Sequence, residues 1–109
     1  MHIVIAGGSG SVGKALRNHF ENKGNQVFAL SRNAKNPIHR WDPEKGVINP
    51  EALQEADVVI NLAGANMAGG LWTKKYKKLL YDSRIDSTKL LVETLAKLSQ
   101  KKRHFIQAS

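Results

Sequence analysis

The sequence has no cysteine among its 109 residues, which excludes disulfide bonds and thiolate chemistry and removes any need for an oxidising compartment. It has no apolar run near the ~18 residues of a membrane span. Its first residues follow the pattern of a core strand rather than of a signal peptide. From these absences we expect a cytoplasmic protein with no membrane partner and no metal site.

Acidic residues are also few, because nine Asp and Glu stand against seventeen Lys and Arg, for a net charge of +8. Such an excess is typical of nucleic-acid-binding proteins. The basic residues cluster at 74–78 and 101–103, and no known nucleic-acid-binding motif accompanies them. We therefore interpret both clusters as solvated faces, expect no nucleic-acid partner, and keep nucleic-acid binding as the weakest alternative.

Glycine is concentrated near the start of the chain. An apolar run over residues 1–6 is followed by four glycines within seven positions and then by a helical pattern. The segment fits G-x-G-x-x-G through Gly8, Gly10 and Gly13, and equally G-x-x-G-x-x-G through Gly7, Gly10 and Gly13. A strand, a glycine turn and a helix N-terminus together form a cradle for a pyrophosphate, whereas a simple tight turn needs fewer glycines.

The rest of the chain alternates between strand and helix patterns and fits one domain, residues 1–109. The predicted strands cover residues 1–6, 26–30, 38–41, 57–63 and 104–108, and the predicted helices 11–23, 49–56 and 73–99, the last with a break near Asp82 and Ser83. This alternation predicts an α/β fold, a doubly wound parallel sheet of the Rossmann type with about five strands in the order 3-2-1-4-5. Ligands then bind at the carboxyl ends of the first and fourth strands, where the strand order reverses.

The residues after the second strand indicate which dinucleotide binds. NAD-binding proteins carry an acidic residue there to accept the ribose hydroxyls, but this chain has Ser31 and Arg32. A guanidinium cannot accept a hydrogen bond, yet its fork suits a 2′-phosphate, to which the serine hydroxyl can also donate. NADP is therefore favoured over NAD, and the alternative is a surface arginine that opens a loop.

Several short motifs resemble one family. The turn at residues 6–13 resembles the T-G-G-T-G-F-I-G loop of extended and atypical short-chain dehydrogenase/reductases. Further motifs resemble, in order, the NAD-dependent epimerase/dehydratase-like family of predicted nucleoside-diphosphate-sugar epimerases: Leu30-Ser31-Arg32, Trp41-Asp42-Pro43, Asn61-Leu62-Ala63-Gly64-Ala65-Asn66, Trp72-Thr73 and Asp82-Ser83-Arg84. The departures are small: Ala6 replaces the usual threonine, Ser11 an aromatic residue, and Ala65 a glutamate.

The resemblance implies a set of cofactor-binding residues, comprising Gly7, Ser9, Gly10, Ser11, Val12, Gly13, Ser31, Arg32, Leu62, Ala63, Gly64 and Arg84. It also implies a catalytic hydroxyl at the end of the fifth strand, where Ser109 stands. The family's tyrosine with a lysine four residues later is absent, because Tyr76 and Tyr81 are followed at that spacing by Leu80 and Ile85.

The resemblance further implies that the chain is the N-terminal, NADP-binding part of an epimerase or oxidoreductase. At full length such a protein acts on a nucleotide sugar or another small molecule, whereas we expect the chain alone to be inactive. The alternative is a regulatory or redox-sensing module that binds NADP without chemistry, and a tyrosine–lysine pair after the fifth strand would favour the enzyme. We also expect a homodimer, because the fifth strand, with Phe105 and Ile106, would leave an unpaired outer edge.

Overall fold

The computed structural model describes residues 1–7, 11–62, 74–98 and 102–107. Within these residues, one parallel sheet has the strand order β2-β1-β5-β6, and two short strands form a separate antiparallel pair. The strands are β1 (His2–Ala6), β2 (Gln26–Leu30), β3 (Trp41–Asp42), β4 (Val47–Ile48), β5 (Val58–Asn61) and β6 (His104–Gln107). The helices are α1 (Ser11–Asn22), the 3-10 helix η1 (Pro37–His39), α2 (Glu51–Gln54) and α3 (Lys74–Lys97).

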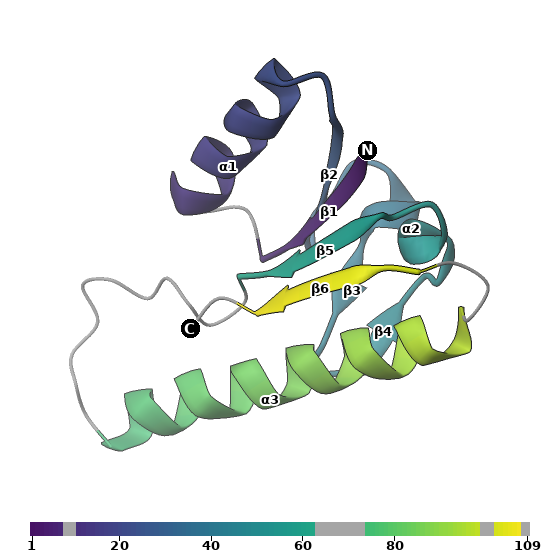
Figure 1. The fold of residues 1–109 in the computed structure, drawn as a ribbon. Coiled ribbons are helices and arrows are strands. Elements are labelled where there is room, and N and C mark those ends of the chain that lie inside the picture. The colour runs from purple at the N-terminus through teal and green to yellow at the C-terminus, as the bar shows by residue number, and fades with distance from the viewer. Residues whose placement is uncertain (8–10, 63–73, 99–101, 108–109) are drawn as a thin grey trace.

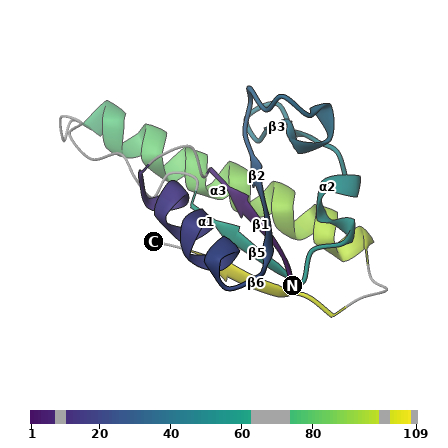
Figure 2. The same cartoon turned by 90° about the horizontal axis from the view of Figure 1, so that it is seen from above.

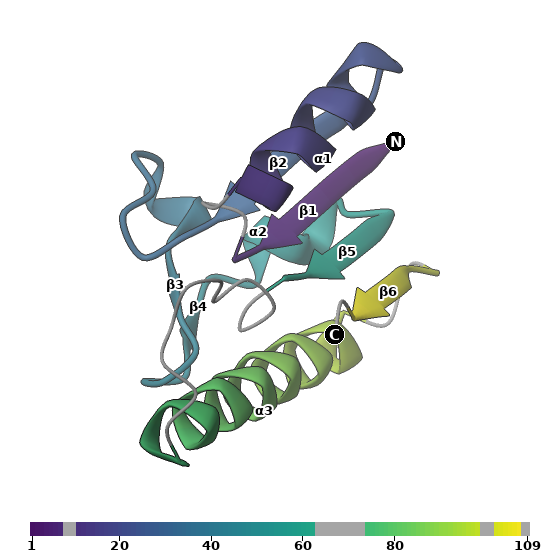
Figure 3. The ribbon, with the colours of Figure 1, turned by 90° about the vertical axis from the view of Figure 1, so that its left-hand side faces the viewer.

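The two long helices cover opposite faces of the sheet, α1 on one side and α3 on the other (Figures 1 and 3). The chain steps from β1 to β2 in one direction along the sheet and from β5 to β6 in the other. Because such crossovers are right-handed, opposite steps place their helices on opposite faces. The predicted Rossmann-type α/β fold is therefore confirmed.

The strands of the sheet supply the core on both faces, as the nearly unbroken apolar sequences of β1 and β5 predict. Alternate residues point to opposite faces. On the α1 face the buried cluster consists of Ile3, Ile5, Val27, Ile60 and Leu62, with Leu16 and Phe20 of the helix packed against it. On the α3 face the cluster consists of Val4, Ala6, Leu30, Trp41, Leu53, Ala56, Val59 and Leu91.

The prediction that residues 38–41 form a third strand of the parallel sheet is wrong. Pro37 opens η1 instead, and the Asn36 side chain caps this turn by accepting a hydrogen bond from the Ile38 N–H at 3.1 Å. Because this turn takes Ile38 and His39 out of an extended conformation, the segment meets the end of β2 through an isolated bridge, Ser31 to Arg40. The chain then folds back as the β3–β4 hairpin on the β2 side of the molecule, and the remaining strands keep the predicted order (Figure 2).

The predicted break in the long helix is also wrong, because α3 runs without interruption through Asp82 and Ser83. The predicted start of the short helix is close to the observed one. Pro50 precedes α2, and the Asn49 side chain accepts a hydrogen bond from the Glu51 N–H at 3.0 Å. In the part of the chain that the structure describes, no helix is long and apolar enough to cross a membrane.

Candidate functional site

Three neighbouring strands end at the same level of the sheet. Ala6 of β1 is in register with Leu30 of β2 on one side and with Asn61 of β5 on the other. The Leu62 N–H donates to the Ala6 carbonyl at 2.8 Å and holds the exit of β5 against the end of β1. Since parallel strands share a carboxyl edge, the residues that follow them meet at one edge.

The first of these exits leads into the glycine turn. Gly7 has φ = 75°, a left-handed conformation in which a side chain is strained, and this turns the chain out of β1. Helix α1 then begins at Ser11, with Val12 exposed and Gly13 buried in its first turn. The first N–H groups of a helix lack partners within it and carry the positive end of its dipole, so this edge favours an anion.

The second exit carries Ser31 and Arg32. The Ser31 N–H donates to the His39 carbonyl at 3.1 Å, and the Trp41 N–H donates to the Ser31 carbonyl at 3.2 Å. These bonds fix the backbone of Ser31 and leave its hydroxyl for other partners. The Arg32 side chain is 61% exposed, and its Nη2 lies 3.8 Å from carboxylate oxygens of both Asp42 and Glu44.

Ser31 also lines a pocket of about 380 Å³ between α1, the end of β2 and the loop at residues 34–36. Two further cationic side chains, Arg17 of α1 and Lys35 of the loop, line the same pocket. The Arg17 Nε is already paired with Glu21 at 2.8 Å. The pocket is therefore polar, with Lys35 as a further cation, and it adjoins the end of β2 where an anionic group is expected.

The third exit is fixed by a buried cluster around Asn61, which is fully buried. Its Nδ2 lies 3.1 Å from Ser87 Oγ, 3.3 Å from Thr88 Oγ1 and 3.0 Å from Gln107 Oε1. The Thr88 hydroxyl donates to the same Gln107 oxygen at 2.8 Å. One side chain thus ties the ends of β5 and β6 to the middle of α3.

Arg84 lies on α3 one turn before this cluster. Its carbonyl accepts a hydrogen bond from the Ser87 hydroxyl at 3.1 Å. The side chain is half-buried, and among the described residues its Nε, itself buried, has no hydrogen-bond partner. Buried polar groups without a partner are uncommon, so this nitrogen keeps Arg84 as a candidate site residue.

The structure thus places Gly7, the start of α1, Ser31, Arg32 and Leu62 at one edge of the sheet. Leu62 contributes through its backbone, since its side chain is buried in the core on the α1 face. The other predicted site residues lie outside the described residues: Ser9, Gly10, Ala63, Gly64 and Ser109. The same holds for the side chain of Ser11.

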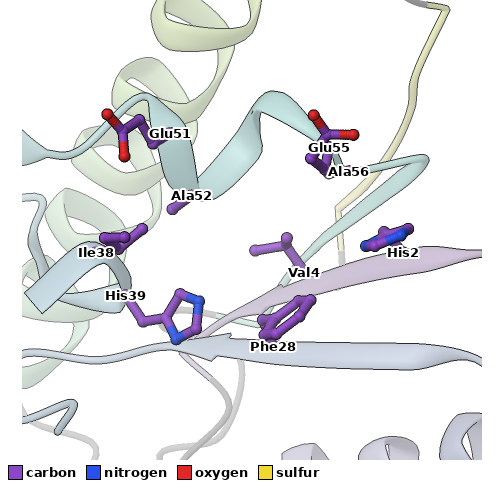
Figure 4. A pocket seen from close by; sticks show the side chains of 9 residues that line it. All are labelled: His2, Val4, Phe28, Ile38, His39, Glu51, Ala52, Glu55 and Ala56. Carbon is purple, nitrogen blue, oxygen red and sulfur yellow. The ribbon is translucent and has the colours of Figure 1, made fainter. Parts of the chain in front are cut away.

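A second, apolar pocket of about 180 Å³ lies toward the opposite end of the strands, where β1 begins at His2. Figure 4 shows its floor, formed by Val4 and Phe28, with the carboxylates of Glu51 and Glu55 turned outward. Cofactor pockets are usually of about 300–1,000 Å³, so this one is too small for a dinucleotide. It does not compete with the carboxyl edge as the nucleotide site.

Two features of the site were not predicted from the sequence. The Trp41-Asp42-Pro43 motif was noted, but nothing in it indicates that the hairpin brings Asp42 and Glu44 to Arg32. Likewise Asn61 belongs to a noted motif, whereas its partners on α3 and β6 follow it by 26 to 46 residues. A polar residue at the end of an otherwise apolar strand was the available signal, since buried amides need partners.

The sheet, the glycine turn and the helix that follows it define a Rossmann-like protein, and comparison with known proteins gives its family. The NAD dependent epimerase/dehydratase family matches residues 3–109, and the chain belongs to this family. The epimerase family protein Mb2239 of Mycobacterium bovis is 37% identical over 97 residues, which cover 86% of this chain and 32% of that protein. The chain thus spans about a third of the length of this curated relative.

Two solved structures share the fold. A human epimerase family protein, SDR39U1, solved with NADPH, superposes with a TM-score of 0.73 at 25% identity, covering 98% of this chain and 36% of that one. A nucleoside-diphosphate sugar epimerase from Corynebacterium glutamicum superposes with a TM-score of 0.76 at 31% identity, covering 100% of this chain and 22% of that one. Both are similar over nearly the whole of the present chain.

Proposed function

We propose that the chain binds NADP(H) across the carboxyl edge of its sheet. The pyrophosphate meets the glycine turn and the N-terminus of α1, and the adenosine 2′-phosphate meets Ser31 and Arg32. The observation that carries this proposal is that β2 is followed directly by a serine and an arginine, where an NAD-binding protein would carry an acidic residue. A guanidinium at this position suits a phosphate and cannot accept a hydrogen bond from a ribose hydroxyl.

Further observations support the same cofactor. The pocket beside Ser31 adds Arg17 and Lys35 to the positive charge at this end of β2. Arg84, whose carbonyl bonds to the Ser87 that contacts Asn61 at the end of β5, has a buried Nε without a hydrogen-bond partner among the described residues. The structure of the human relative contains NADPH, which is the cofactor that we infer for this chain.

The residues named here would bind and orient the cofactor, which supplies hydride transfer when bound. We propose that the chain is the dinucleotide-binding domain of a cytoplasmic, NADP-dependent epimerase or oxidoreductase. Its substrate would be a nucleotide sugar or another small molecule, and the Ser109 hydroxyl would lie near the reacting group.

Titration of the chain with NADPH and NADH tests the cofactor choice. We expect NADPH to bind more tightly and Arg32→Asp to narrow or reverse the preference by about 1–3 kcal/mol, the loss of a charge-assisted contact. Lys89→Asp, an exposed position on α3 with the same change of charge, is the matched control and should leave the preference unchanged. Equal affinity of the unmodified chain for both cofactors would contradict the proposal.

A further inference from the structure

Arg32 is accompanied by two carboxylates. Its Nη2 lies 3.8 Å from Asp42 Oδ1 and 3.8 Å from Glu44 Oε2. The whole chain contains nine acidic residues against seventeen basic ones, yet two of the nine stand at this one arginine. The three side chains together carry a charge of −1 in a protein whose net charge is strongly positive.

The β3–β4 hairpin holds these carboxylates in place. It is tied to the end of β2 by the hydrogen bond from the Trp41 N–H to the carbonyl of Ser31, the residue directly before Arg32. Its turn is closed by hydrogen bonds from Lys45 N–H to the Asp42 carbonyl at 3.2 Å and from Gly46 N–H to the Pro43 carbonyl at 3.3 Å. The left-handed φ of Gly46, 68°, completes the turn, so the acids are part of a defined local structure.

The ion pairs are solvated rather than buried, because the Asp42 side chain is 25% exposed and that of Glu44 76% exposed. Exposed pairs contribute little to folding. The carboxylates of Asp42 and Glu44 nevertheless compete with any other anion for the Arg32 guanidinium. A 2′-phosphate carries roughly two negative charges at neutral pH, so it would both need Arg32 and be repelled by its carboxylate neighbours.

We propose that Asp42 and Glu44 are specificity-determining residues that limit the preference of this site for NADP over NAD. This inference rests on the proposed function, since it takes Arg32 to be the group that meets the 2′-phosphate. When no phosphate is present, the acids hold the guanidinium. Their oxygens can also accept hydrogen bonds from the free ribose hydroxyls of NAD, which a guanidinium cannot do. The hairpin therefore offsets part of the selectivity that Ser31 and Arg32 provide.

The experiment measures the dissociation constants of NADPH and NADH for the chain and for Glu44→Gln at about 50 mM salt, where surface charges are weakly screened. Asp42→Asn is the second variant, and its amide oxygen can still accept from the Lys45 N–H, as Asp42 Oδ1 does at 3.4 Å. Glu93→Gln is the matched control, because it removes the same charge from an exposed position on α3. Circular dichroism verifies that each variant is folded.

We expect the ratio of the NADH to the NADPH dissociation constant to rise about two- to fivefold in Glu44→Gln and in Asp42→Asn, as for loss of an exposed charge pair. The ratio should stay unchanged in Glu93→Gln, and the effect should shrink at about 0.5 M salt. An unchanged or lower ratio in both hairpin variants would overturn the inference while leaving the proposed function intact. If the folded, unmodified chain bound neither cofactor at about 1 mM, the proposed function itself would fail.

Discussion

Replacing Asn61 with leucine tests how strongly the end of β5 is fixed to α3 and β6. Leucine has nearly the same volume, so the change removes the amide without leaving a large cavity. The Nδ2 group has two protons and faces three acceptors at 3.0, 3.1 and 3.3 Å, which amounts to two full hydrogen bonds. Counting the Nδ2 bonds alone at about 1 kcal/mol for each net bond, we expect a loss of at least about 2 kcal/mol in the free energy of unfolding.

The neighbours of Asn61 keep this loss from growing much larger. The Ser87 hydroxyl still donates to the Arg84 carbonyl at 3.1 Å, and Gln107 Oε1 still accepts from the Thr88 hydroxyl at 2.8 Å. No buried donor among these groups is therefore left without a partner. Asn61→Asp should lower the free energy of unfolding more than Asn61→Leu does, because it buries a charge and places a carboxylate next to the Gln107 oxygen.

Urea unfolding followed by circular dichroism measures both variants. Asn18→Leu, at an exposed position of α1, is the control and should change the free energy of unfolding by no more than about 0.5 kcal/mol. If Asn61→Leu were as stable as the unmodified chain within the same margin, the buried cluster would not hold the strand end, and the reasoning would be refuted.

Two further predictions concern the helix start and assembly. Gly13→Val should abolish NADPH binding in a chain that still shows native circular dichroism. The reason is that Gly13 is buried in the first turn of α1, where a branched side chain would separate the helix from the strand. Unchanged affinity for NADPH would argue against a pyrophosphate site at the glycine turn. We propose that the chain dimerises through β6, which forms the outer edge of the described sheet (Figure 3) and leaves Ile106 50% exposed on the same face of the sheet as Ile60, whereas Phe105 packs on the α3 face. Light scattering at micromolar concentration should show a dimer of the 12.0 kDa chain and a monomer for Ile106→Asp, and a monomeric unmodified chain would contradict this.

The parts of the fold that the sequence predicted well depend on short-range patterns. The apolar runs of β1 and β5 indicate strands covered on both faces, and the glycine turn between β1 and α1 is a local signal. From these, the right-handed crossover rule determines which strands are neighbours. The position of Ser31 and Arg32 at the site edge follows from the same reasoning.

The parts that it did not predict depend on contacts between distant residues. The apolar pattern of residues 38–41 fits a strand, but Pro37 and the burial of Trp41 direct the segment into a turn and a hairpin. Similarly, Glu44 is an ordinary surface acid by its sequence context and becomes relevant only because the hairpin returns to Arg32. Local pattern cannot show where such a loop returns.

The location of the bound cofactor is the central claim, and amide chemical shifts measured during an NADPH titration test it most directly. We predict that the largest shifts occur at the carboxyl edge of the sheet: Gly7, Val12, Gly13, Ser31, Arg32 and Leu62. Residues at the opposite end, such as His2 and Glu51 beside the apolar pocket, should shift little. Shifts confined to that opposite end, or no shifts at saturating NADPH, would contradict the account.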